Sequence, residues 1–193
     1  MRATGVAVVA SARIYRTGWG ENMSITMYEI AVPSFKKHLE ALDAIIDKAA
    51  AYCEARKIEP ETLLAARLYP DMYTFKKQVQ SACDFAKLSV GRLAGLKPPV
   101  HDDSEKTFAD LKQRIAETMA VLDEAKPDAM EAAADREVTI KAGPRELKFP
   151  GREYLLHFAL PNFYFHCATA YGILRHNGLE IGKRDFMKRL PAA

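Results

Sequence analysis

The sequence of 193 residues contains few cysteines, little net charge and no long hydrophobic run. Its three cysteines, Cys53, Cys83 and Cys167, form no CxxC pair, and their odd number argues against a disulfide framework or a zinc knuckle. The formal net charge is +3, and three arginines against Glu21 place +2 of it in residues 1–22, so the rest of the chain offers no basic surface for nucleic acid. No stretch approaches the roughly 20 apolar residues of a membrane span. We therefore expect a cytoplasmic protein that binds neither nucleic acid nor membranes.

The sequence also lacks the motifs of familiar catalytic and nucleotide-binding sites. GxGxxG, GxSxG and P-loop patterns are absent. No basic neighbour in the sequence explains how the thiol of Cys83 or Cys167 would be activated as a nucleophile. The catalytic residues, if the protein is an enzyme, are therefore unknown from the sequence.

What the chain does have is the composition of one globular domain, with 49% hydrophobic and 27% charged residues. Residues 1–22 show no helical periodicity, and the apolar run at 6–9 is shorter than the roughly 7–15 residues of a signal peptide. We expect residues 1–22 to be a disordered N-terminal extension and residues 23–190 to form the domain.

Apolar residues recur at three- and four-residue spacing in four long segments, which predicts four helices. These cover residues 25–57, 72–93, 102–126 and 151–176, with a short helix at 58–67. Thr26 or the serine before it is a cap candidate for the first helix, which Pro33 bends or starts late. Asp102 and Glu105 resemble a capping box for the third, and Gly95 ends the second.

In residues 137–149 the spacing of apolar residues changes from the helical period to strict alternation. Segments 137–141 and 146–149 alternate apolar and polar residues around turn residues at 142–145, so we expect a small β-hairpin. The last helix follows, with a kink at Pro161. The fold class is therefore all-α, a four-helix bundle with a small β-hairpin insertion before the last helix.

Asn162 and His166 stand four residues apart on the apolar face of the last helix. An unpaired buried amide or imidazole costs about 1–3 kcal/mol, so each needs a partner, a water, a ligand or a metal. His157 lies about 180° around the same helix and is expected at the surface or in a subunit interface. His38 and His101 are expected to face solvent.

A second stripe on the last helix makes it apolar on nearly all sides. Leu160, Tyr164 and Tyr171 lie opposite His166. A helix buried on two sides in a domain of this size predicts a twofold interface, and we expect a homodimer through these three residues.

The last helix also carries a family resemblance. His166, with Arg175 nine residues later and Gly178 twelve residues later, has the spacing of the last-helix motif of the DinB/YfiT-like superfamily. The segments LYPDMYTFKKQVQSACDFAK and LPNFYFHCATAYGILRHNGLEIGKRDF resemble the uncharacterised bacterial family DUF1993 within it. The resemblance implies an up-down-down-up bundle, usually a homodimer, with no established activity. It also implies a divalent metal held by an HxxxH pair on the last helix and a third histidine on the second.

The sequence departs from that metal-binding pattern. Asn162 replaces the first histidine of the pair, and Gln80, with Asp84 one turn on, stands where the third ligand would fall. A catalytic metal site uses three protein ligands, and amides are poor ligands for zinc. His166 remains as one possible metal ligand, and a bound divalent metal is not favoured; the cofactor is unknown.

Three functional hypotheses remain. The first is a polar pocket around Asn162, His166, Gln80 and Asp84 that binds a small ligand, with its reaction unknown. The second is a divalent-metal-dependent transferase or hydrolase that acts with low-molecular-weight thiols, as the resemblance implies, with His166 as a ligand. The third is a non-enzymatic structural or partner-binding dimer, in which Asn162 and His166 belong to a polar network that sets helix register.

Overall fold

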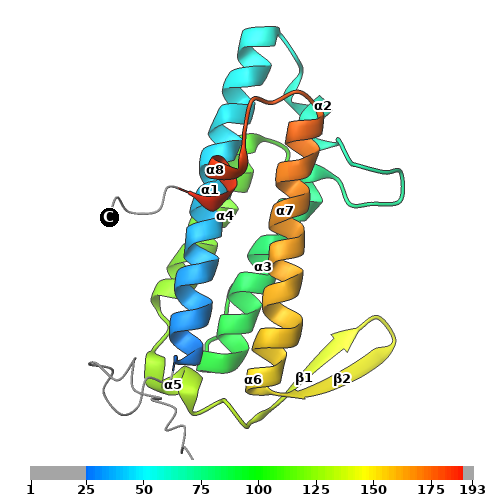
Figure 1. The fold of residues 1–193 in the computed structure, drawn as a ribbon. Helices are drawn as coiled ribbons and strands as arrows, with labels where there is room; N and C mark the ends of the chain where they lie inside the picture. The colour runs from blue at the N-terminus through cyan, green and yellow to red at the C-terminus, as the bar shows by residue number, and fades with distance from the viewer. Residues whose placement is uncertain (1–24, 189–193) are drawn as a thin grey trace, which may run out of the picture.

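The computed structural model describes residues 25–188, and most of them are helical (Figure 1). The expected disordered extension, residues 1–22, lies outside the described residues, as do residues 23–24 and 189–190 of the expected domain. Four helices of sixteen or more residues lie side by side: α1 (Met27–Arg56), α3 (Phe75–Ala94), α4 (Phe108–Asp123) and α7 (Leu160–His176). The shorter helices are α2 (Pro60–Leu64), α5 (Pro127–Glu131), α6 (Gly151–Glu153) and α8 (Lys183–Met187).

The long helices share one core. α3 lies between α4 and α7, while α1 packs against α4, α7 and α8. The largest side chains that are completely buried include Phe35 of α1, Phe75 of α3 and Phe163 of α7. The rings of Phe35 and Phe163 meet edge to face with centroids 4.8 Å apart. No helix between residues 25 and 188 combines the length and apolar character that crossing a membrane requires.

The helix ends follow local capping chemistry. The Thr26 hydroxyl accepts from the Glu29 amide to begin α1, so this helix starts well before Pro33 rather than at it. Thr74 caps α3, three residues later than the periodicity predicts, and Gly95 ends it at a φ of 74°. The predicted short helix at 58–67 is also longer than the observed α2.

The predicted cap of α4 is wrong. Thr107 and Asp110 form the capping box, because the Thr107 hydroxyl accepts from the Asp110 amide and the Asp110 carboxylate accepts from the Thr107 amide. Asp102 and Glu105 precede the helix in a loop, and the Glu105 carboxylate accepts a hydrogen bond from Arg114 instead.

The hairpin consists of β1 (Glu137–Ala142) and β2 (Arg145–Pro150), as the alternation predicts. The strands are antiparallel, with Ile140 opposite Leu147, and Gly143 turns the chain at a φ of 62°. Ile140 is buried while its neighbour Lys141 is exposed. The hairpin extends from the end of the bundle that carries α6 (Figure 1).

The last helix contains a π-helical turn. The segment η1 (Tyr154–Ala159) joins α6 to α7, so the helical backbone runs from Gly151 to His176. The wider turn comes directly before Pro161, whose missing amide hydrogen and ring disturb the regular α-helical ladder. A wheel of 100° per residue therefore does not hold through this segment, and the irregularity lies at the predicted kink.

Candidate functional site

His166 is held between α7 and α3. Its side chain is only 8% exposed, and its Nδ1 atom lies 2.7 Å from Oε1 of Gln78. The Gln78 amide nitrogen faces the Tyr73 carbonyl oxygen at 3.4 Å, so the amide oxygen faces the histidine. Since that oxygen can only accept, His166 Nδ1 carries the hydrogen and donates it. The Nε2 atom of the neutral imidazole then holds a lone pair.

Aromatic rings surround the same imidazole. Phe85 and Tyr73 stack against it with centroids at 5.4 Å and 6.3 Å, and Phe165 meets it edge on at 5.4 Å. Burial, followed by the positive charge of Lys77, lowers the pKa of His166 below its ordinary value of 6.5. His166 is therefore neutral at pH 7.

The Nε2 atom of His166 is not completely buried. It has no hydrogen-bond partner among residues 25–188. In that range, the one side-chain polar atom that is both completely buried and without a partner is Nε of Arg114, so Nε2 of His166 is not completely buried. Nε2 must therefore retain contact with water. A neutral imidazole with one nitrogen fixed by the protein and the other partly exposed can accept a hydrogen bond or a proton from a bound molecule.

Asn162, the other half of the pair, bonds to its own helix. Its Nδ2 donates to the Phe158 carbonyl oxygen at 2.7 Å, and the side chain is half-buried. The amide oxygen of Asn162 remains as a second acceptor one helical turn from His166.

Gln80 and Asp84 belong to a different set of contacts, on the α4 side of α3. The Gln80 amide donates to Glu105 at 2.7 Å, and Asp84 accepts from Arg114 at 2.8 Å. Arg114 is 2% exposed and also donates to Glu105 and to Asp103, at 2.7 and 2.8 Å. Burial raises and hydrogen bonds from Arg114 lower the pKa of Glu105, and the net shift is downward, which keeps it ionised.

Sequence reasoning missed Gln78 as the partner of His166. Residues two apart on an α-helix differ by about 200° of rotation, so Gln78 and Gln80 point to nearly opposite sides of α3. The helical pattern placed Gln80 at the edge of the apolar stripe, and Gln78 lies at the other edge. The one available signal was that both are glutamines beside a buried face.

The residues at this position do not fit the divalent metal that the superfamily resemblance implies. One imidazole is present, its Nδ1 is bound to Gln78, and the Asn162 amide nitrogen is bound to a backbone carbonyl. Between residues 25 and 188, no three His, Cys, Asp or Glu side chains are grouped so that they could hold a metal ion. This position therefore lacks the three protein ligands of a catalytic metal site.

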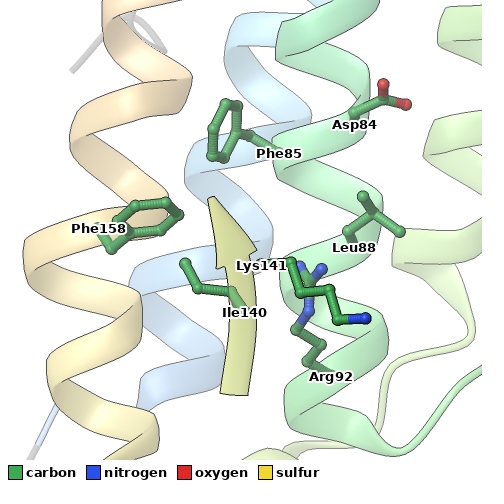
Figure 2. Close-up of a pocket in the computed structure, with 7 residues that line it drawn as sticks. All are labelled: Asp84, Phe85, Leu88, Arg92, Ile140, Lys141 and Phe158. Atoms are coloured by element: carbon green, nitrogen blue, oxygen red, sulfur yellow. The ribbon is translucent and has the colours of Figure 1, made fainter. Parts of the chain in front are cut away.

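A cavity of about 180 Å³ lies beside His166, between α3, the hairpin and the π-helical turn. Figure 2 shows Asp84 at one end, Arg92 and Lys141 at the other, and the apolar side chains of Phe85, Leu88, Ile140 and Phe158 between them. The Phe85 ring stacks on His166 and also lies 5.9 Å from the Phe158 ring. Phe85 thus forms the boundary between the cavity and the histidine.

The three cysteine thiols are buried and free. Burial raises the pKa of Cys83 to about 12 and raises that of Cys167 well above its ordinary value. Neither supplies a thiolate near neutral pH, so the cavity has no cysteine nucleophile.

The stripe expected to form a dimer interface is partly covered inside the chain. Leu160 is buried, and Tyr164 and Tyr171 are half-buried. The Tyr164 ring meets His38 of α1 at 5.0 Å, and the Tyr171 ring meets Phe186 of α8 at 5.9 Å. His38 is itself buried against α7, so the expectation that it faces solvent is wrong.

His157 is at the surface, where the helical pattern placed it. It lies 3.2 Å from Glu153, one turn earlier on the last helix. His101 is mostly buried rather than solvent-facing, and its Nε2 lies 2.8 Å from Glu117. Neither histidine lines the cavity beside His166.

Comparisons with known proteins agree on the family. A crystal structure of a DinB family member protein from Shewanella denitrificans is 42% identical in sequence and superimposes with a TM-score of 0.80, covering 86% of this chain and 94% of that one. No curated protein matches the sequence significantly. The profile of the family described as "Domain of unknown function (DUF1993)" matches residues 27–187. The chain therefore belongs to the DUF1993 family and has a DinB-like fold.

Proposed function

We propose that this protein binds a small organic ligand at the cavity between α3, the hairpin and the π-helical turn, beside the polar atoms of Asn162 and His166. One observation carries the proposal. An aromatic-lined cavity adjoins, through Phe85, a neutral histidine whose Nε2 has no hydrogen-bond partner among residues 25–188. Apolar walls with a few fixed polar groups are the usual composition of small-molecule sites. The reaction, if there is one, is unknown.

The polar atoms beside the cavity are held in place before any ligand arrives. Gln78 orients the His166 ring, and the Phe158 carbonyl holds the Asn162 amide nitrogen. Both side chains then offer acceptors, so they suit a ligand group that donates a hydrogen bond. Because the protein has already ordered them, binding costs little side-chain entropy.

A non-enzymatic structural role is the second candidate. The His166–Gln78 and Asn162–Phe158 hydrogen bonds satisfy the polar atoms that face the protein, and the first of them links two helices of the core. A satisfied network of this kind specifies helix register without any ligand. The low exposure of His166 supports this role, whereas the adjoining cavity supports ligand binding.

We further propose that the protein is a cytoplasmic homodimer with the up-down-down-up helix order that the family resemblance implies. Three free, buried thiols are consistent with a reducing compartment. The half-buried Tyr164 and Tyr171 leave part of their surface for a second copy. Figure 1 shows α1 and α7 running in one direction and α3 and α4 in the other, which supports this helix order.

Ligand-observed NMR with a library of single-ring and short aliphatic fragments tests the proposed site. Leu88→Trp places a large side chain at the cavity from a position that is 36% exposed. Leu68→Trp adds the same side chain at a position outside the cavity that is 42% exposed. Fragments should bind the wild type and the Leu68→Trp variant and should fail to bind the Leu88→Trp variant. If no fragment binds, or if fragments bind the Leu88→Trp variant as well as the wild type, the structural role is the better supported function.

A further inference from the structure

We infer that the ligand of the α3–hairpin cavity is a small monoanionic organic acid, with its carboxylate between Arg92 and Lys141 and its apolar body against Phe85 and Phe158. This inference rests on the proposed ligand-binding function. It adds the charge and the size of the ligand, and both come from the way in which the cavity is lined.

The two ends of the cavity differ in whether their charge is already compensated. Asp84 accepts from Arg114 at 2.8 Å and lies 3.1 Å from the Lys87 ammonium, so its carboxylate is neutralised inside the protein. Within residues 25–188, neither Arg92 nor Lys141 forms an ion pair. The cavity therefore presents uncompensated positive charge at the hairpin end only, and this end favours an anion.

Arg92 is held in position by a neutral group. Its Nη1 donates to the Tyr154 hydroxyl oxygen at 2.9 Å, and that hydroxyl also lies 3.1 Å from the Ser89 hydroxyl. A guanidinium has five N–H donors, so this contact leaves the others for a carboxylate. Because the Tyr154 hydroxyl is neutral, this hydrogen bond leaves the positive charge of Arg92 uncompensated. Lys141 is exposed and adds a second positive charge from the hairpin (Figure 2).

The dimensions limit the ligand to one ring or a short branched chain. The cavity volume of about 180 Å³ is close to the roughly 150 Å³ of an engineered apolar cavity that binds benzene. Arg92 and Phe85 are seven residues apart on α3, which corresponds to about 10 Å along the helix axis. A phenyl group joined to a carboxylate by two carbon atoms spans a distance of this order.

Three isosteric probes test the sign of the charge by isothermal titration calorimetry and NMR: 3-phenylpropanoate, its neutral amide and 3-phenylpropylammonium. We expect the carboxylate to bind about tenfold more tightly than the amide, and the ammonium to bind most weakly. The affinity of the carboxylate should fall with added salt, since Arg92 and Lys141 are both exposed.

Lys141→Gln should lower the affinity for the carboxylate several-fold and leave the affinity for the amide unchanged. Arg145→Gln removes the same charge from the same hairpin at an exposed position that does not line the cavity, and it should change neither. If the carboxylate and the amide bind the wild type equally and neither binds the Leu88→Trp variant, the anion inference is overturned. The proposed ligand site is supported by the same result. Tightest binding of the ammonium would also overturn it. If neither the probes nor any library fragment binds, the proposed function itself fails.

Discussion

The imidazole of His166 on α7 donates a hydrogen bond from Nδ1 to Oε1 of Gln78 on α3, over 2.7 Å. This contact selects the tautomer of the histidine and leaves Nε2 as an acceptor without a partner among residues 25–188. It also joins two helices of the core, so the same pair of residues contributes to stability and shapes the candidate site.

Removing the Gln78 amide should leave the His166 Nδ1–H without its partner in a mostly buried position. Gln78→Leu keeps a similar volume, and we expect it to lower the free energy of unfolding by about 1–3 kcal/mol. Gln113→Leu is the matched control, because its amide donates only to Glu117 at the surface and its loss should cost less than about 0.5 kcal/mol. Urea unfolding of both variants measures the difference. Equal losses would mean that the His166–Gln78 bond adds nothing to stability.

The buried histidines predict a loss of stability on mild acidification. Burial, helped by the charge of Lys77, lowers the folded-state pKa of His166; burial also lowers that of His38, although its bond to the Ser34 carbonyl opposes the shift. Above about pH 6.5 both are neutral in either state. Below it the unfolded chain binds protons that the folded chain does not, so the free energy of unfolding falls with pH until the folded histidines also titrate.

Urea unfolding at pH 7.5 and 5.5 measures this slope. His166→Gln keeps a hydrogen-bonding side chain but cannot titrate, so it should lose less stability between the two pH values than the wild type. The exposed His176 provides the control, and His176→Gln should retain the wild-type loss. Each unit of difference between the folded-state and unfolded-state pKa corresponds to about 1.4 kcal/mol of unfolding free energy, which is fully lost only when the pH lies below both values. An unchanged slope in His166→Gln would contradict the lowered pKa.

Arg114 should be the most sensitive charged residue of α4. It lies 2.7–2.8 Å from carboxylate oxygens of Asp84, Asp103 and Glu105, so Arg114→Met leaves three acidic groups without their shared cation. We expect a loss of about 3 kcal/mol, near the low end for broken buried pairs because two of the carboxylates are about one third exposed.

Lys112→Met is the control for Arg114, since Lys112 also lies on α4 but pairs near the surface with the carboxylates of Asp43 and Asp47 of α1. It should cost at most about 1 kcal/mol. The comparison uses the midpoint of urea unfolding at pH 7. If the two substitutions cost the same, the buried position of Arg114 does not determine its contribution.

The three cysteines should be inert in the folded protein. All three thiols are buried, and burial raises the pKa values of Cys53, Cys83 and Cys167. A chromogenic disulfide reagent at pH 8 should label none within minutes and all three after unfolding in guanidinium. Lys97→Cys, which adds a thiol at an exposed position, should react at once. Rapid labelling of a native cysteine would show that the core opens near it.

The dimer prediction concerns the face of α7 opposite His166. Light scattering should give about twice the chain mass of 21.6 kDa. A double variant with Tyr164→Ala and Tyr171→Ala should shift the mass toward a monomer, whereas Phe165→Ala, on an exposed position beside His166, should not. A wild-type monomer at micromolar concentration would end the homodimer proposal.

Local chemistry along the chain was sufficient to predict much of the fold. Helical spacing of apolar residues and a glycine at the end of α3 depend on neighbours within a few positions, and the alternation at 137–149 marked the hairpin for the same reason. The Asp102 cap failed because two acceptable capping pairs stood close together, and Asp102 with Glu105 competed with Thr107 and Asp110. The Glu105 carboxylate instead neutralises Arg114, a residue nine positions later that no local rule connects to it.

The sequence alone determined that His166 needs a partner, because its place on an apolar helix face makes an unpaired imidazole costly. It could not decide which glutamine supplies that partner. Gln78 and Gln80 sit at opposite edges of one helical stripe, about 200° apart, and the rotation of α3 against α4 and α7 turns one toward each neighbour. The cavity also depends on the tertiary structure, since α3 is distant in sequence from the hairpin and the π-helical turn and meets them only in the folded chain. That rotation and that meeting are set by the sum of all core contacts, which no short stretch of sequence contains.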